Sequence, residues 1–110
     1  MQDLNRIEIR GRVGRVIFRN IAGGQVANLS VATNYCYKNH EGSPVIETTW
    51  HNVTAWGNEK NRIADLKKGA TVHVTGRLRQ IRFTTASGED RTTPEIFAAT
   101  LEVITNDNAE

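Results

Sequence analysis

A chain of 110 residues is long enough for one domain with a buried core and too short for an active-site cleft between two domains. Its hydrophobic and charged fractions, 38% and 24%, are those of a globular protein, and no apolar run approaches the roughly 20 residues of a membrane helix. The net charge of +2 is compatible with a nucleic-acid partner but does not require one.

The first third of the chain predicts a β-hairpin. Residues 6–13, RIEIRGRV, alternate between apolar and charged side chains, which is typical of a strand with one buried face. The strand continues after a bend at Gly14, and the turn signal AGG at 22–24 leads into a second strand at 25–37, rich in β-branched and aromatic residues. The segment 38–44, KNHEGSP, has the composition of a loop.

A third strand is predicted at 45–56, and its alternation is unusual. In an extended backbone Trp50 and Trp56 share one face with Asn and Thr side chains, whereas His51 and Val53 lie on the other. Two explanations are open for these tryptophans: they pack under a neighbouring loop, or they are exposed to bind a ligand.

One short helix is predicted after the third strand, at 58–68. Asn58 is a suitable N-cap, Ile63 and Leu66 share one face, and Gly69 is a stop signal. The basic residues of the last turn complement the helix macrodipole.

Two further strands are predicted at 70–83 and 94–104, joined as a long hairpin by the polar tip 84–93. Five strands with one helix between the third and fourth predict an all-β fold, the five-stranded Greek-key barrel called the OB-fold. A small β-sandwich is the alternative, although it usually needs about seven strands. We expect one domain over 1–104, followed by a short polar tail at 105–110.

Four segments in this order resemble the bacterial single-stranded-DNA-binding protein family: GGQVANLSVAT, TTWHNVTAWG, LKKGATVHVTGRLR and GEDRTT. The resemblance extends from about Leu4 to Ile104. It implies a homotetramer of OB-folds that binds single-stranded DNA in replication, recombination and repair, without enzymatic activity. Family members normally continue into a long linker with an acidic tip that recruits other proteins, whereas this chain stops at NDNAE. Recruitment through an acidic tail is therefore not expected.

The predicted binding residues are aromatic and basic. Bases are expected to stack on four aromatic rings, because stacking tolerates any sequence: Trp50, Trp56, Tyr37 and Phe83. Two positions that are often Trp in the family are Tyr37 and Phe83 here, and Trp56 stands where Phe is common. Phosphates are expected to contact six basic residues, each of which could alternatively be a solvated surface charge: Arg10, Arg12, Lys38, Arg77, Arg79 and Arg82.

The remaining aromatic and histidine residues are assigned to the scaffold. Phe18 and Phe97 have apolar neighbours, so we expect both in the core. His51 has the parity of Val53, so it is expected to point into the barrel or into a subunit contact. The single cysteine, Cys36, is expected to be a small strand filler.

No sequence motif supports an enzyme or a metal site. The chain has no nucleophile elbow, no P-loop, no CxxC pair and only scattered histidines. We expect no cofactor, no metal, no small-molecule substrate and no membrane association, and a cytoplasmic location. Two rivals remain: a tailless, dimeric primosomal relative, and an OB-fold adaptor that binds protein.

Overall fold

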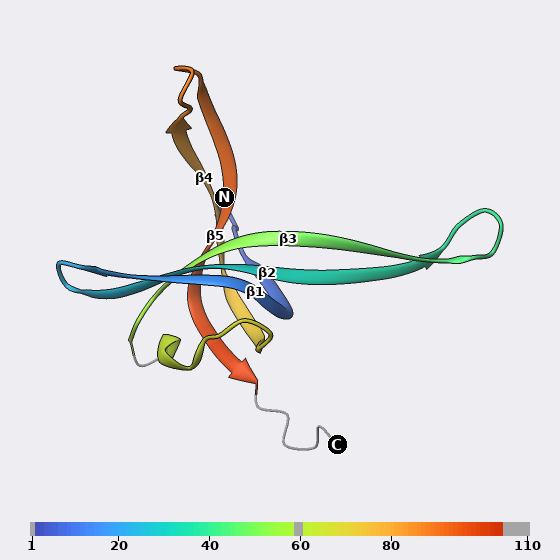
Figure 1. The fold of residues 1–110 in the computed structure, drawn as a ribbon, viewed down its shortest axis with the longest axis horizontal. Helices are drawn as coiled ribbons and strands as arrows, with labels where there is room; N and C mark the ends of the chain where they lie inside the picture. The colour runs from blue at the N-terminus through green and yellow to red at the C-terminus, as the bar shows by residue number, and fades with distance from the viewer. Residues whose placement is uncertain (1, 59–60, 105–110) are drawn as a thin grey trace.

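The computed structural model describes residues 2–58 and 61–104, which form a closed barrel of five strands (Figure 1). The strands are β1 (Ile7–Ile21), β2 (Gly24–Lys38), β3 (Pro44–Trp56), β4 (Thr71–Thr84) and β5 (Asp90–Ile104). They close in the order β1-β2-β3-β5-β4, with β3 and β5 parallel and the other neighbours antiparallel. The predicted five-stranded barrel is confirmed.

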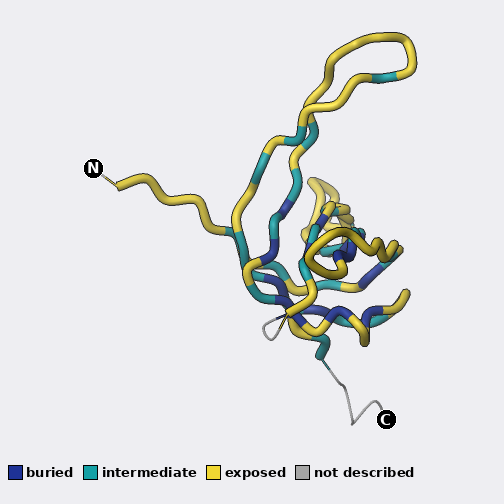
Figure 2. The backbone as a smooth tube through the Cα atoms, turned by 90° about the vertical axis from the view of Figure 1, so that its left-hand side faces the viewer, coloured by how far each residue is buried: buried dark blue, intermediate teal, exposed yellow. Residues whose placement is uncertain are grey.

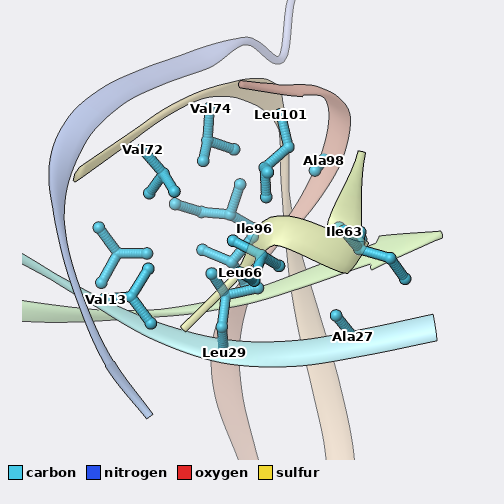
Figure 3. Packing of buried hydrophobic residues seen from close by; sticks show 13 residues of the cluster. Val13, Ala27, Leu29, Ile63, Leu66, Val72, Val74, Ile96, Ala98 and Leu101 are labelled. Carbon is cyan, nitrogen blue, oxygen red and sulfur yellow. The ribbon is translucent and has the colours of Figure 1, made fainter. Parts of the chain in front are cut away.

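The barrel is filled by alternate residues of each strand. Val53 and Ala55 of β3 are 1% and 0% exposed, and Val72 and Val74 of β4 are fully buried. Figure 3 shows these β4 valines beside Leu101 of β5, all pointing into the same apolar centre. Full burial of one such aliphatic side chain contributes roughly 1.5–3 kcal/mol. In β3 and β4 the period-two pattern of these residues therefore specifies which side of the strand faces the core.

The strand β1 reverses its inward parity at Gly14. Val13 is paired with Val31 and Arg15 with Ser30, so Gly14 has no partner in the β1–β2 ladder. Such a bulge inserts one residue and shifts the alternation. The bend predicted at Gly14 is this bulge, and Arg15 consequently faces outward.

Two long hairpins extend as arms beyond the barrel (Figure 1). The β2–β3 arm comprises residues 34–48 and the β4–β5 arm residues 80–94. Figure 2 shows the buried residues gathered in the barrel, while the arms carry exposed and half-buried residues. The strands thus continue well past the point where they have a core to cover.

The predicted helix at 58–68 is wrong in extent. A 3₁₀ turn, η1 (Ile63–Asp65), is the helical structure found there, and residues 59 and 60 of the prediction lie outside the described residues. Backbone hydrogen bonds join Asn58 and Asn61 in both directions, which makes a tight turn. Ile63 and Leu66 then enter the barrel end, 4% and 5% exposed. Tertiary burial of these two side chains outweighs the weak helix propensity of so short a segment.

The core assignment of two phenylalanines is also wrong. Phe18 is 40% exposed, because it lies where β1 leaves the barrel toward the β1–β2 turn. Phe97 is half-buried on the outward side of β5, between the inward residues Ile96 and Ala98. Apolar neighbours in the sequence reveal neither the outward side of a strand, as at Phe97, nor the end of the core, as at Phe18.

Candidate functional site

The outward side of β3 carries both tryptophans. Since Val53 and Ala55 fill the barrel, the alternate residues face the opposite way. These outward residues are Trp50, Asn52, Thr54 and Trp56. Trp50 is 60% exposed, whereas Trp56 is half-buried. Trp50 therefore has the accessibility that base stacking requires, and Trp56 has part of it.

Trp50 packs over the bulge of β1. A Cβ atom added at Gly14 would lie 2.8 Å from Cη2 of Trp50 and 3.0 Å from Oγ of Ser30. A residue without a side chain at position 14 thus makes room for the indole. The ring is fixed from one side and open to solvent on the other.

Arginines of β1 flank the outward residues of β3. Three cross-strand rows over β1, β2 and β3 are Arg12–Ala32–Trp50, Arg15–Ser30–Asn52 and Arg19–Val26–Trp56. Neighbouring strands are about 4.8 Å apart, so each arginine backbone lies roughly 10 Å from the β3 residue of its row. We use the name outer face for the outward side of β1, β2 and β3 along these rows, together with the adjoining outward side of β5 and β4.

The sequence pattern missed Arg15 and Arg19. Strict alternation from Arg12 would have directed both toward the core, but the bulge at Gly14 turns them outward. The bend at Gly14 was a usable signal, because a one-residue insertion reverses the parity of everything after it.

The opposite flank of the outer face is a cluster of one aromatic ring and two arginines. Phe97 lies beside Thr54 in the parallel β3–β5 pairing and directly opposite Arg77 in β4. The guanidinium carbons of Arg77 and Arg79 are 5.2 and 5.3 Å from the centroid of the Phe97 ring. The predicted phosphate ligands Arg77 and Arg79 are therefore close together on the outer face.

A chain of side-chain hydrogen bonds crosses four strands of this face. The guanidinium of Arg19 donates to Oδ1 of Asn28, with Nε at 3.1 Å. Asn28 Nδ2 donates to Thr54 Oγ1 at 2.8 Å, and that hydroxyl donates to Glu95 Oε2 at 2.6 Å. The chain begins at a cation and ends at an anion, so it ties the strands together and orients the Glu95 carboxylate toward β3.

The centre of the outer face is hollowed. A pocket of about 200 Å³ is lined by residues from all five strands, among them Arg15, Ile17, Asn52, Ile81 and Glu95. It combines apolar walls with a few polar groups, as ligand-binding hollows commonly do.

The aromatic residues of the β2–β3 arm lie on the side opposite to Trp50. Tyr37 is 44% exposed and stacks with Tyr35, with centroids 6.1 Å apart and planes at 28°. Tyr35, omitted from the predicted site, is 66% exposed. Its spacing of two residues from Tyr37 was the available signal. The arm therefore offers a second aromatic surface rather than an extension of the first.

Two predicted site residues of the β4–β5 arm, Arg82 and Phe83, lie on opposite sides of the hairpin. Phe83, 44% exposed, has the outward parity of Arg77 and Arg79. Arg82 has the opposite parity, paired with Thr92. Of the predicted phosphate ligands in β4, Arg77 and Arg79 thus share one side with Phe83, and Arg82 lies on the other.

The remaining predicted basic residues lie outside the rows. Lys38 is exposed at the end of the β2–β3 arm, opposite Pro44. Arg10 is exposed and pairs with His73, whose Nε2 is 2.6 Å from Oε2 of Glu8. A carboxylate near Arg10 makes that position less suited to phosphate than Arg12.

His51 points inward, as its parity predicts, at the mouth of the barrel. Its Nε2 lies 2.9 Å from Oγ1 of Thr33, and burial lowers the pKa of the imidazole because the charged form is poorly solvated there. The predicted subunit contact through His51 stays a prediction.

Cys36 lies in a strand, as predicted, but it is exposed on the β2–β3 arm and fills no core. Within residues 2–58 and 61–104, no three His, Cys, Asp or Glu side chains form a group that could hold a metal ion. In the same residues no helix has the length and hydropathy needed to span a membrane.

Comparison with known sequences assigns residues 4–104 to the model of the Single-strand binding protein family. Two curated relatives, the single-stranded DNA-binding proteins of Neisseria meningitidis serogroups A and B, are each 33% identical over 105 residues. The match covers 92% of this chain and 60% of each relative, so the chain spans little more than half of their length.

Two solved structures share the fold of this chain. The Plasmodium falciparum SSB in complex with ssDNA superposes with a TM-score of 0.79 at 26% identity, covering 96% of this chain and 98% of that one. The small single-stranded DNA-binding protein of Streptomyces coelicolor gives 0.69 at 22% identity, covering 94% and 96%. The second likeness supports the fold alone.

Proposed function

This chain belongs to the single-strand binding protein family, and from that membership we propose that it binds single-stranded DNA across the outer face and the two arms. The observation that carries the proposal is the exposed Trp50, fixed over Gly14 and flanked by the outward arginines of β1. Arg12 of β1 lies in the same cross-strand row as Trp50 of β3, two strands away. A base and its phosphate would then find a ring and a cation in the same row.

The proposed binding combines two contributions. A base stacked on Trp50 gains roughly 1–3 kcal/mol whatever its identity, because every base has a π-face. The arginines contact phosphates, which gives affinity without sequence choice and makes it depend on salt. Binding independent of sequence is the expected result.

We infer that the protein acts by binding, without catalysis, in the cytoplasm and in replication, recombination and repair. We further propose a homotetramer, because one chain offers a limited number of separated aromatic surfaces. His51 at the barrel mouth is the proposed subunit contact.

The test is a titration with oligo-dT, followed by tryptophan fluorescence, together with the mass in solution. Stacking on Trp50 is expected to quench emission strongly, and duplex of equal length is expected to change it little. Light scattering is expected to give a mass near four times 12.3 kDa. Unchanged emission at saturating oligo-dT would favour a protein-binding adaptor, and a dimer would favour the primosomal rival.

A further inference from the structure

We propose that Phe97 is a positioning residue that holds Arg77 and Arg79 as a preformed pair of phosphate ligands on the outer face. The inference rests on the proposed function, since it concerns how the same surface holds the backbone of single-stranded DNA. Phe97 would act through the two arginines and would not itself stack on a base.

The geometry places both cations against one ring. The guanidinium carbons of Arg77 and Arg79 lie 5.2 and 5.3 Å from the Phe97 centroid, within the roughly 6 Å at which the negative ring face attracts a cation. Arg77 is the direct cross-strand partner of Phe97, and Arg79 projects from the same side of β4 two residues further on. Phe97 is half-buried, so the ring itself is anchored.

The two arginines also keep their charge available. Arg62 and Arg91 are paired with Asp65 and Glu89, but within the described chain no ion pair involves Arg77 or Arg79. Glu95 is the direct cross-strand partner of Arg79. Its carboxylate instead accepts the Thr54 hydroxyl at 2.6 Å. The Thr54 hydroxyl thus holds the Glu95 carboxylate toward β3, and within the described chain Glu95 forms no ion pair with Arg79.

Anchoring matters because a free arginine loses side-chain freedom when it binds a phosphate. A contact with Phe97 restricts both side chains before DNA arrives. Phe97 lies beside Thr54, so the pair is two strands from the outward tryptophans of β3. A backbone held there can direct its bases toward Trp50 and Trp56.

The contact is tested first without DNA. In a ¹⁵N–¹H spectrum of the arginine Nε–H groups, two resonances that disappear in Arg77→Met and Arg79→Met are expected upfield, shifted by the ring current of Phe97. Phe97→Leu is expected to move both back to the common arginine position, and Phe97→Trp to keep them displaced. Resonances that do not respond to Phe97→Leu would overturn the proposal, whatever the protein binds.

Binding to oligo-dT then tests the role. Phe97→Leu is expected to weaken affinity roughly 3- to 10-fold while the slope of log K against log[salt] stays unchanged, because the charges remain. Phe97→Trp is expected to restore affinity. In an Arg77→Met/Arg79→Met background, Phe97→Leu is expected to have no further effect.

Phe18→Leu is the control, since it makes the same substitution at a more exposed phenylalanine, and no arginine lies over the Phe18 ring among the described residues. It is expected to leave affinity unchanged. An equal loss from Phe97→Leu with and without the arginines would make Phe97 a base platform or a scaffold residue, and would refute the proposal. If the unaltered protein fails to bind oligo-dT, the proposed function fails, and the arginine spectrum still decides the contact.

Discussion

The strands β2 and β3 pass through two environments, the barrel and the β2–β3 arm, with one continuous ladder of hydrogen bonds. In the barrel, Val31 and Val53 are almost fully buried. In the arm, Tyr35 and Ile46 are both 66% exposed although they lie on opposite sides of the hairpin. Large apolar side chains therefore stabilise the fold in the barrel, whereas in the arm they are exposed on the surface. Substitutions in the barrel are expected to affect folding, and those on the outer face or the arms to affect binding.

The largest expected effect is a truncation in the barrel. Leu101→Ala removes a side chain that is 1% exposed at the core centre, so the free energy of unfolding is expected to fall by roughly 2–5 kcal/mol. Ile46→Ala, at 66% exposure in the arm, is the control and is expected to change it by about 0.5 kcal/mol or less. Urea unfolding measures both. Equal losses would remove the distinction between barrel and arm.

The second effect is on binding. Trp50→Ala is expected to weaken oligo-dT binding by roughly 1–3 kcal/mol and to leave the salt slope nearly intact, because stacking displaces no condensed ions. Its unfolding free energy is expected to change little, since the side chain is 60% exposed. Trp56→Ala, at a half-buried position, is expected to reduce both affinity and stability. If Trp50→Ala unfolds the protein instead, Trp50 belongs to the scaffold.

Alternation in the sequence predicted the strands and placed Trp50 and Trp56 on one side of β3, but it left open whether that side is exposed. A strand has two sides, and Val53 and Ala55 could fill the core only by turning Trp50 outward. The same rule failed for Arg15 and Arg19 after one inserted residue, because pairing register and not sequence spacing determines orientation past a bulge.

Contacts between distant residues could not be predicted from a local pattern. Arg77 and Phe97 meet because β4 and β5 pair in one particular register, which depends on the whole hairpin and its bulge near Gly76. The short 3₁₀ turn has the same origin, since burial of Ile63 and Leu66 under the barrel decides its shape. The sequence thus predicted which side of a strand a residue occupies, whereas the structure was needed to identify its neighbours on other strands.

A third change tests the junction between the two regions. Gly14→Ala places a methyl group where the Trp50 ring now lies, 2.8 Å from Cη2. The exposed indole can move away, so the expected cost in unfolding free energy is about 1 kcal/mol, the low end for overpacking. Weaker oligo-dT binding and a shift in tryptophan emission are expected as well.

The control is the same substitution in a Trp50→Ala background, where it is expected to lower the unfolding free energy no further. An undiminished loss there would show that the bulge backbone, not the indole, requires glycine.

The smallest effect concerns His51, an inward side chain at the barrel mouth, close to where β3 enters the barrel from the arm. Burial lowers its pKa in the folded protein below the value of about 6.5 in the unfolded chain. The unfolded state therefore binds the proton more readily. The contribution of neutral His51 is complete above about pH 6.5 and is lost as the pH falls from there toward the lowered pKa.

Urea unfolding at pH 8 and pH 5.5 is expected to show a larger loss of stability on acidification for the unaltered protein than for His51→Gln. His40 and His73 are present in both proteins, so the difference between the two isolates His51. An identical loss of stability in both proteins would mean that the barrel mouth at His51 is as well solvated as the arm. The boundary between the arm and the buried barrel would then lie at Val53.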